Sequence, residues 1–377
     1  DPFANGAGDI ALNVVVDPAH TGDPRKYLER NTLPLFALGI PQRLAEEISL
    51  DLYAQRDAAR AFACENGQAG AALTSKGVTY GTIVVNRIAS NPCSVTFDTS
   101  QLDGIDADLV IRPFGWKGNH ATIRAFTRGA AHNELGLQAV ELVGDKDGDY
   151  DGVINELSVG DLTALTTYMA ALERPVTRIE LADLGLDDLS ILEHADIQTG
   201  ETLFASAGCV VCHTPSMKLD EPIFHEPSRV AGFFDMKFPD GSDPETHGLS
   251  YEKSVSFDLS KDQPNNRITL ASGQEHHLGA LETIEGDVVA RWYTDFKRHD
   301  MGAELSDPND PLGLGASKFL TRSLAGVGVT GPWLHDGRAT TLDDAIRMHG
   351  GAGLSEDERA QVVAFLENQV MYHDGDE

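Results

Sequence analysis

The chain has 377 residues, which exceeds the usual size of one hydrophobic core and favours two domains. Its 59 Asp and Glu residues outnumber 29 Lys and Arg, and the formal charge of -30 makes nucleic acid and anionic membranes poor partners. No apolar run reaches the roughly 18 residues that a membrane-spanning helix needs, so we expect no membrane span. The charge would suit a basic protein partner, although solubility or a salty habitat explains it equally well.

The first predicted element is a helix over residues 42–62. Pro41 fits its first turn, and Leu44, Ile48 and Leu52 repeat at four-residue spacing on one face. A β-like run follows at residues 78–88. We predict that this run pairs with residues 94–97 as a hairpin.

Cys64 and Cys93 flank the β-like run. The chain opens at Asp1 without a Met, which suggests a mature product whose export signal has been removed. In an oxidising compartment the two cysteines most simply form a disulfide. Two separate buried thiols are the alternative.

An acidic loop over residues 145–156 has the pattern of a calcium site, because its alternating carboxylates can direct several hard oxygens at one cation. A start at Asp147 puts Gly152 at the sharp turn, whereas a start at Asp145 puts Glu156 in the last, bidentate position. We prefer the first register, and an acidic solvated turn is the alternative to calcium binding. The predicted Ca²⁺ ligands are Asp147, Asp149, Asp151, Val153 and Glu156, with Asp145 and Asp161 as alternatives.

A domain boundary is predicted in residues 175–196, which are rich in Asp, Leu and turn residues. They follow a predicted helix over residues 159–172, whose N-cap is Ser158. The boundary divides the chain into an N-terminal domain, 1–195, and a C-terminal domain, 196–377.

The stretch Cys209-Val210-Val211-Cys212-His213 is the most informative part of the sequence. Two thiols at this spacing match the two vinyl groups on one edge of haem, and the adjacent histidine is placed to become the proximal ligand of the iron. A redox dithiol would need a strand-to-helix context, and a zinc site would need a second pair of ligands at short spacing. Neither is present, so we predict one covalently bound haem c. Covalent haem is attached outside the bacterial inner membrane, and the expected location is therefore periplasmic or extracellular.

The second axial ligand of this iron is expected downstream. Thr341 can cap a helix whose apolar face carries Ile346 and His349, and Gly350-Gly351 ends that helix. Met348 lies nearer to the polar face. His349 is therefore the predicted ligand and Met348 the alternative, although a histidine at a helix C-terminus can also simply bond a backbone carbonyl. The weaker candidates are Met236, His299, Met301 and His335.

The remaining elements resemble those of a small haem domain. A helix over residues 197–208 carries Gly200 and Phe204 on one face, where a last helix can cross it closely. That last helix begins at the capping box of residues 355–358. A Gly-, Pro- and Asp-rich insertion occupies residues 215–310. The predicted fold class is mainly α, with two cytochrome c-like domains, a divergent N-terminal one without its own haem motif, long loops and few short strands.

Several motifs occur along the chain in the following order: Phe114-Gly115-Trp116-Lys117-Gly118, the acidic loop with Gly160-Asp161, residues 200–213, His299-Asp300-Met301-Gly302, and Leu334-His335-Asp336-Gly337-Arg338 with His349-Gly350-Gly351. Together they resemble the bacterial di-haem oxidoreductases related to di-haem cytochrome c peroxidase and to the methylamine-utilisation di-haem enzymes. By this resemblance the C-terminal haem belongs to Cys209, Cys212 and His213, with His349 as the other axial ligand. Trp116 would be an electron relay between haem sites, and a buried structural Trp is the alternative.

The chain departs from this family in having one haem attachment motif instead of two. Cys64-Glu65-Asn66-Gly67-Gln68 is no substitute, because it lacks the second thiol and the histidine. We therefore expect a second haem-bearing segment or chain, unless the N-terminal haem has been lost. His132 and Glu134 fall near the distal pocket of the family and are catalytic candidates for peroxide chemistry, although a surface or helix-end role also suits them.

The resemblance implies an exported c-type cytochrome that acts in electron transfer within a di-haem peroxidase-like oxidoreductase, together with a redox partner protein that could be basic. The alternative function is a non-enzymatic monohaem electron-transfer subunit of a larger redox complex. It is suggested by the predicted ligands, because a haem closed on both faces does not bind peroxide without losing one of them.

Overall fold

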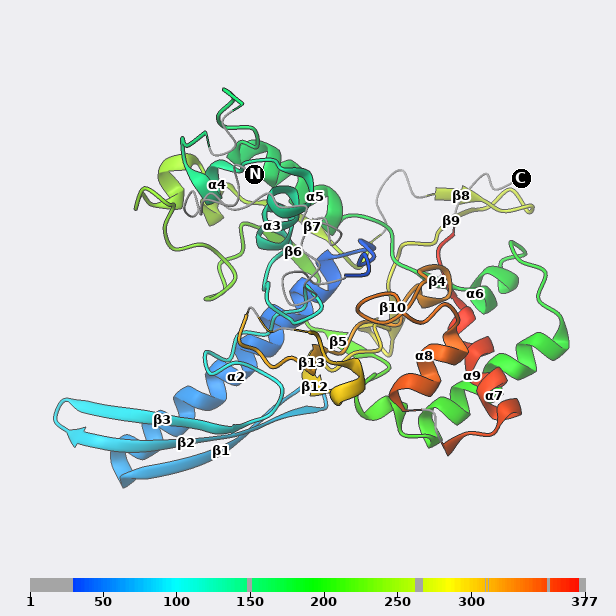
Figure 1. The fold of residues 1–377 in the computed structure, drawn as a ribbon, viewed down its shortest axis with the longest axis horizontal. Coiled ribbons are helices and arrows are strands. Elements are labelled where there is room, and N and C mark those ends of the chain that lie inside the picture. The colour runs from blue at the N-terminus through cyan, green and yellow to red at the C-terminus, as the bar shows by residue number, and fades with distance from the viewer. Residues whose placement is uncertain are drawn as a thin grey trace.

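The computed structural model describes residues 30–147, 151–261, 267–308, 310, 312–350 and 353–372. Figure 1 shows a long helix, α2, that runs from the middle of the molecule along a projecting three-stranded sheet, with α3 to α5 on one side and α7 to α9 grouped at another. Among the described residues no helix is both long and apolar enough to cross a membrane.

Helix α2 (Gly39–Asn66) confirms the first predicted helix and extends it at both ends. Leu44, Ile48 and Leu52 are completely buried, as their four-residue spacing predicted. The helix therefore anchors the N-terminal part of the described chain through one continuous apolar stripe.

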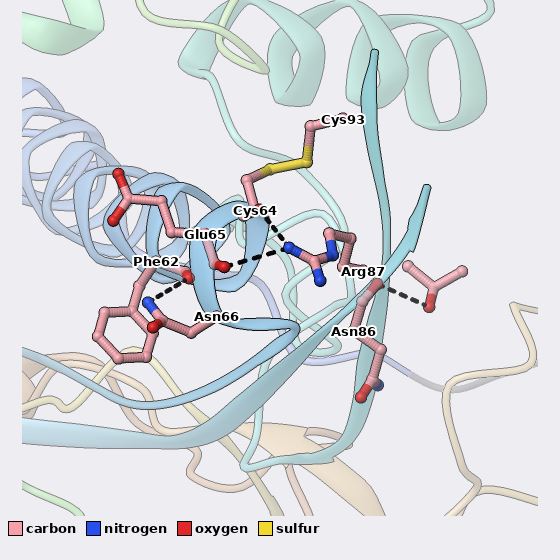
Figure 2. The surroundings of a disulfide bond; sticks show 8 residues. Phe62, Cys64, Glu65, Asn66, Asn86, Arg87 and Cys93 are labelled. Atoms are coloured by element: carbon pink, nitrogen blue, oxygen red, sulfur yellow. Dashed lines mark hydrogen bonds between the residues drawn. A yellow bond between two sulfur atoms is a disulfide. The ribbon is translucent and has the colours of Figure 1, made fainter. Parts of the chain in front are cut away.

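The projecting sheet consists of β1 (Gln68–Ser75), β2 (Val78–Ser90) and β3 (Cys93–Leu102), antiparallel and in that order. The predicted hairpin is confirmed, since Phe97 pairs with Val85. The predicted disulfide is present as well. It joins the end of α2 to the start of β3 through Cys64 and Cys93, and beside it Arg87 donates Nη1 to the carbonyl oxygen of Cys64 at 2.7 Å (Figure 2).

The prediction of a mainly α fold with few short strands is wrong, because 35 % of the described residues are helical and 21 % lie in strands. Most of the unpredicted strands have two to four residues, which is too short for an alternating pattern to be recognised. They form one further three-stranded sheet, β10-β11-β5, and the pairs β12-β13, β14-β4, β6-β7 and β8-β9. Their bounds are β4 (Val176–Thr177), β5 (Met217–Leu219), β6 (Ile223–Glu226), β7 (Val255–Asp258), β8 (Arg267–Thr269), β9 (Glu275–His277), β10 (Glu282–Ile284), β11 (Asp287–Ala290), β12 (Arg298–Asp300), β13 (Lys318–Leu320) and β14 (Gln369–Val370).

Helices α3 to α6 lie between the first sheet and α7 in the chain. Ser158 caps α5 as predicted. In this capping box the carboxylate of Asp161 accepts a hydrogen bond from the backbone N–H of Ser158. The helix begins where the sequence indicated because this cap satisfies its first N–H groups. The four are α3 (Ile123–Leu135), α4 (Val140–Val143), α5 (Val159–Ala170) and α6 (Arg178–Asp183).

The last group of helices, α7 (Ile191–Ser206), α8 (Leu342–His349) and α9 (Glu356–Glu367), lies together at one end of the molecule (Figure 1). Helix α7 crosses α9 at Gly200, where an added Cβ would lie 1.9 Å from the carbonyl oxygen of Gln361. The rings of Phe204 and Phe365 pack beside the crossing with centroids 5.3 Å apart. Gly200 and Phe204 therefore lie at the close crossing of the two helices, as the sequence predicted.

The largest hydrophobic core draws on both sides of residue 195. It joins the apolar face of α2 to residues such as Phe224 and Trp292 from the insertion. A separate core joins Phe204 and Tyr293 to apolar residues of α8 and α9. The division of the chain at residues 195 and 196 stays a prediction.

We expect the Gly200→Ala variant to be less stable than the native protein by about 1–3 kcal/mol, because the new methyl group would force α7 and α9 apart. Gly160→Ala is the matched control, since its Cβ would meet only the Ser158 side chain, at 3.6 Å. Urea unfolding followed by circular dichroism measures both. Equal stabilities of the two variants would contradict the tight crossing.

Candidate functional site

A cavity of about 560 Å³ lies where α7, α8 and α9 meet strands β12 and β13. Apolar side chains and a few polar groups share its wall. The wall includes Trp116, Phe204, Cys209, Cys212, His213, His299, Met301, Arg322, His335, Leu342, Ile346, His349, Val362 and Leu366.

A tight turn at the end of α7 presents the two thiols and His213. Gly208 adopts a left-handed conformation with φ of 86°, which glycine reaches without strain, and a short 3-10 helix, Cys209–Val211, follows it. The backbone N–H of His213 then donates to the carbonyl oxygen of Cys209 at 2.9 Å. Both cysteines carry free, half-buried thiols on this turn.

The rings of His213 and His349 both line the cavity, with their centroids 6.4 Å apart and their planes at 67°. Nδ1 of His213 donates to the carbonyl oxygen of Tyr293 at 3.1 Å, and Nδ1 of His349 donates to the carbonyl oxygen of Ala345 at 2.6 Å. A carbonyl only accepts, so each ring keeps its proton on Nδ1 and leaves the lone pair of Nε2 for a metal.

This geometry fits a single iron between the two histidines. Two metal–imidazole bonds of about 2 Å each, with half of each ring beyond them, separate the ring centres by roughly 6 Å. Burial also lowers the pKa of His213 to about 4, which keeps its imidazole neutral. The cavity therefore combines two thiols, two imidazoles and an apolar wall, which are groups that bind haem c.

The structure separates His349 from the alternative axial ligands. Met348 is 43 % exposed and Met236 is 71 % exposed, and neither lines the cavity. Met301, His299 and His335 do line it. Both of these histidines face carboxylates: Nε2 of His299 lies 2.7 Å from Asp295, and Nε2 of His335 lies 3.5 Å from Asp307.

Asp295 is a residue that the sequence did not single out. Its hydrogen bond to His299, followed by a contact with Cys212, raises the pKa of His299 to about 10. Ligand atoms of Cys212, Asp295 and His299 lie within 4.8 Å of one another, the one such group found in the described part of the chain. Attachment of haem to Cys212 would convert its thiol into a thioether and remove it from that group.

Trp116 reaches the cavity wall from the N-terminal part of the described chain. Its indole Nε1–H donates to the carbonyl oxygen of Asn31 at 2.8 Å, and the guanidinium of Arg322 lies over its ring at 5.8 Å from the centroid. The structure thus brings Trp116 to the same cavity as His213 and His349.

His132 and Glu134 lie elsewhere, near the end of α3. His132 is buried and Glu134 is exposed, and neither lines the cavity described above. They are also absent from the wall of a second cavity, of about 540 Å³, beside the start of α3. Their catalytic role stays a prediction.

The acidic loop is described in part, because Asp149 lies outside the described residues. Gly152 has φ of 88°, and its N–H donates to Oδ2 of Asp147 at 3.1 Å. The other carboxylate oxygen of Asp147, Oδ1, is buried and has no hydrogen-bond partner in the described residues. The carboxylate of Glu156 accepts from the backbone N–H of Gln138 at 2.8 Å.

The alternative ligands of the loop differ in their surroundings. Asp145 is exposed. Asp161 is engaged in the cap of α5 through Ser158. The side chain of Asp151 bonds the N–H of Val153 at 2.7 Å, within the loop itself.

Comparison with known proteins bears on the C-terminal part of the chain. Residues 263–368 match a family model described as "Di-haem oxidoreductase, putative peroxidase". A cytochrome-c peroxidase of Denitromonas iodatirespirans is 26 % identical over 226 residues, which are 55 % of this chain and 49 % of that protein. The chain thus spans about half the length of this curated relative. These matches confirm the resemblance to di-haem oxidoreductases and cytochrome c peroxidases that the motifs indicated.

Two solved structures are also similar, at low scores. Hydrazine synthase of Kuenenia stuttgartiensis aligns with a TM-score of 0.27 and 22 % identity over 60 % of each chain. A MauG-like protein associated with microbial copper homeostasis aligns with a TM-score of 0.35 and 15 % identity over 92 % of this chain and 94 % of that one. Scores of this size do not assign the fold.

The second cavity contains a histidine whose charge state depends on pH. Nε2 of His120 accepts a hydrogen bond from Nδ2 of Asn119 at 2.8 Å, which fits a neutral ring. Burial, and then the nearby charge of Arg128, lower the pKa of His120 from 6.5 to about 4. As the pH falls through this interval, the unfolded chain takes up a proton at His120 before the folded protein does.

We therefore expect the His120→Gln variant to lose less stability than the native protein on acidification from pH 6.5 to 4. Denaturant unfolding at several pH values measures how far the free energy of unfolding of each protein falls with decreasing pH. Parallel stability curves for the two proteins would contradict a neutral, buried His120.

Proposed function

We propose that this chain is the electron-transfer part of a di-haem peroxidase-like oxidoreductase, and that it carries one haem c on Cys209 and Cys212 with His213 and His349 as axial ligands. One observation carries the proposal: the ring centres of the two imidazoles lie 6.4 Å apart in a cavity that both thiols line, and each Nδ1–H donates to a backbone carbonyl. The matches to a di-haem oxidoreductase model and to a cytochrome-c peroxidase support it.

The residues of the chain have distinct tasks in this proposal. Haem c supplies one-electron redox chemistry when it is bound here. The carbonyl groups of Tyr293 and Ala345 orient the imidazoles of His213 and His349, and the core around Phe204 forms an apolar part of the cavity wall. With His213 and His349 both bound to the iron, the site would transfer electrons and would offer no open iron position for peroxide.

Peroxide reduction then belongs to a second haem, on another segment of the protein or on a partner chain. His132 and Glu134 are our candidates for the acid–base groups at that haem. Trp116, on the wall of the cavity, is the candidate for passing electrons between the two sites. The formal charge of -30 favours a basic redox partner as electron donor, and covalent haem attachment favours a periplasmic location.

We expect the His349→Ala variant to convert a low-spin haem to a high-spin one, because an imidazole ligand of the iron is lost. Met348→Ala is the matched control, since the exposed Met348 should leave the spectrum unchanged. Visible absorption spectra of the oxidised and reduced proteins measure the spin state. A low-spin spectrum in His349→Ala, or a high-spin one in Met348→Ala, would contradict the ligand assignment.

A non-enzymatic monohaem electron-transfer subunit is the second candidate function. The single Cys-x-x-Cys-His motif favours it. Pyridine haemochrome analysis counts the haems, and a peroxide titration followed by electron paramagnetic resonance tests for a reactive iron. One low-spin haem without a peroxide response favours the electron-transfer subunit, whereas a second, high-spin haem favours the peroxidase.

We also propose that the acidic loop binds Ca²⁺ through Asp147, Asp149, Asp151, the carbonyl of Val153 and Glu156. The supporting observation is the buried carboxylate oxygen Oδ1 of Asp147, which has no hydrogen-bond partner among the described residues and for which a cation would compensate. The positive φ of Gly152 suits the register that begins at Asp147.

Removal of calcium with a chelator is expected to lower the melting temperature of the native protein, because a ligand that binds only the folded state stabilises it. Asp147→Asn should melt at a temperature that responds little to the chelator. Asp145→Asn is the control that keeps the native response, because Asp145 lies outside the preferred register. Differential scanning calorimetry measures all three, and a native protein insensitive to chelator would contradict calcium binding.

A further inference from the structure

Arg322 is a cation on the wall of the His213/His349 cavity. Among the described residues that line this cavity, it is the one Arg or Lys side chain. The guanidinium has five N–H donors. One of them, on Nη1, donates to the carbonyl oxygen of Pro113 at 3.1 Å, and the guanidinium lies over the ring of Trp116. No other hydrogen bond of this guanidinium is found within the described residues, and its side chain lines both this cavity and a smaller one that Pro113 also lines.

The charge of Arg322 has no carboxylate partner in the described part of the chain. Burial lowers its pKa to about 10, so the side chain is still positively charged at neutral pH. The buried charge of Arg124, by contrast, is compensated by carboxylates of the chain, because Arg124 pairs with Glu141 at 2.5 Å and with Glu226 at 2.7 Å. A desolvated cation without an anion costs stability, which indicates that Arg322 receives its anion from outside the protein chain.

The two sides of the cavity differ in chemistry. Cys209 and Val210 pack in the apolar core with Phe204 and the helices α8 and α9. Arg322 is not part of that core, and its contacts are with Pro113 and Trp116. Haem has the same polarity, because its vinyl groups and its two propionate carboxylates lie on opposite edges of the ring.

We propose that the guanidinium of Arg322 binds a propionate carboxylate of the haem attached to Cys209 and Cys212. Charge-assisted hydrogen bonds from the guanidinium fork would hold this carboxylate ionised inside the cavity. The inference rests on the proposed haem site and deepens it. It assigns to Arg322 the task of anchoring the propionate edge and of setting the charge close to the iron.

The reduction potential reports this role. Loss of a positive charge near the iron disfavours the reduced state, so Arg322→Gln is expected to lower the midpoint potential. The propionate left without its partner would also have a raised pKa and would take up a proton near neutral pH. The potential of the variant should then decrease with rising pH more steeply than that of the native protein.

The experiment is an equilibrium redox titration of the intact protein at several pH values. Arg322→Lys keeps the charge and should keep a potential close to the native one. Arg60→Gln is the matched control, because Arg60 is exposed on α2 and the same charge is removed away from the cavity. Other titrating groups near the cavity are His299 with Asp295, His335 with Asp307, and Asp300, and they contribute equally to the native and variant curves.

An unchanged potential and pH profile in Arg322→Gln, with low-spin haem attached, would overturn this inference and leave the proposed haem site standing. The absence of low-spin haem from the native protein would instead overturn the proposed function. Should Arg322→Gln fail to attach haem, Arg322→Lys decides: a native-like pH profile supports the propionate contact, and a steeper one overturns it. A native potential that shifts on addition of inorganic phosphate, while that of Arg322→Gln does not, would identify a free anion instead and also overturn it.

Discussion

The close crossing of α7 and α9 at Gly200 is the constraint on which the candidate site depends. The turn with Cys209, Cys212 and His213 continues directly from α7, while α8, which ends at His349, packs on α9. A bulkier residue at the crossing would shift one histidine relative to the other. The spacing of the two imidazoles therefore depends on helix packing as well as on the haem motif itself.

Backbone carbonyl groups then decide what the two histidines can do. Tyr293 and Ala345 accept the Nδ1 protons, which leaves both Nε2 atoms as ligands and fixes the orientation of each ring. His299 and His335 line the same cavity but face carboxylates instead. Four histidines thus share one cavity, and their hydrogen-bond partners divide them into candidate iron ligands and charged or hydrogen-bonding groups.

Sequence reasoning located the local parts of this site and missed the tertiary ones. The caps at Ser158, Thr341 and Ser355, the crossing glycine and the helix position of His349 follow from patterns within a few residues. The carbonyl of Tyr293 lies 80 residues from His213 along the chain, and the position of Arg322 on the cavity wall depends on the folded chain. No sequence pattern indicates either contact.

Apart from the predicted β2–β3 hairpin, the strands were missed for a related reason. Strand β1 (Gln68–Ser75) is rich in Ala and Gly and lacks the β-branched alternation that made β2 recognisable, and its pairing comes from β2 and from packing on α2. The short strands of the insertion likewise depend on partners that are distant in the sequence, such as β5 with β11. Local propensity alone does not specify elements of three or four residues.

The central claim is that His213 and His349 hold one iron between them. Near-infrared magnetic circular dichroism of the oxidised protein tests it most directly, because the energy of the charge-transfer band of a low-spin haem distinguishes two imidazole ligands from an imidazole with a thioether. We expect the band of a haem with two imidazole ligands. A band typical of histidine–methionine ligation, or a high-spin spectrum, would contradict it.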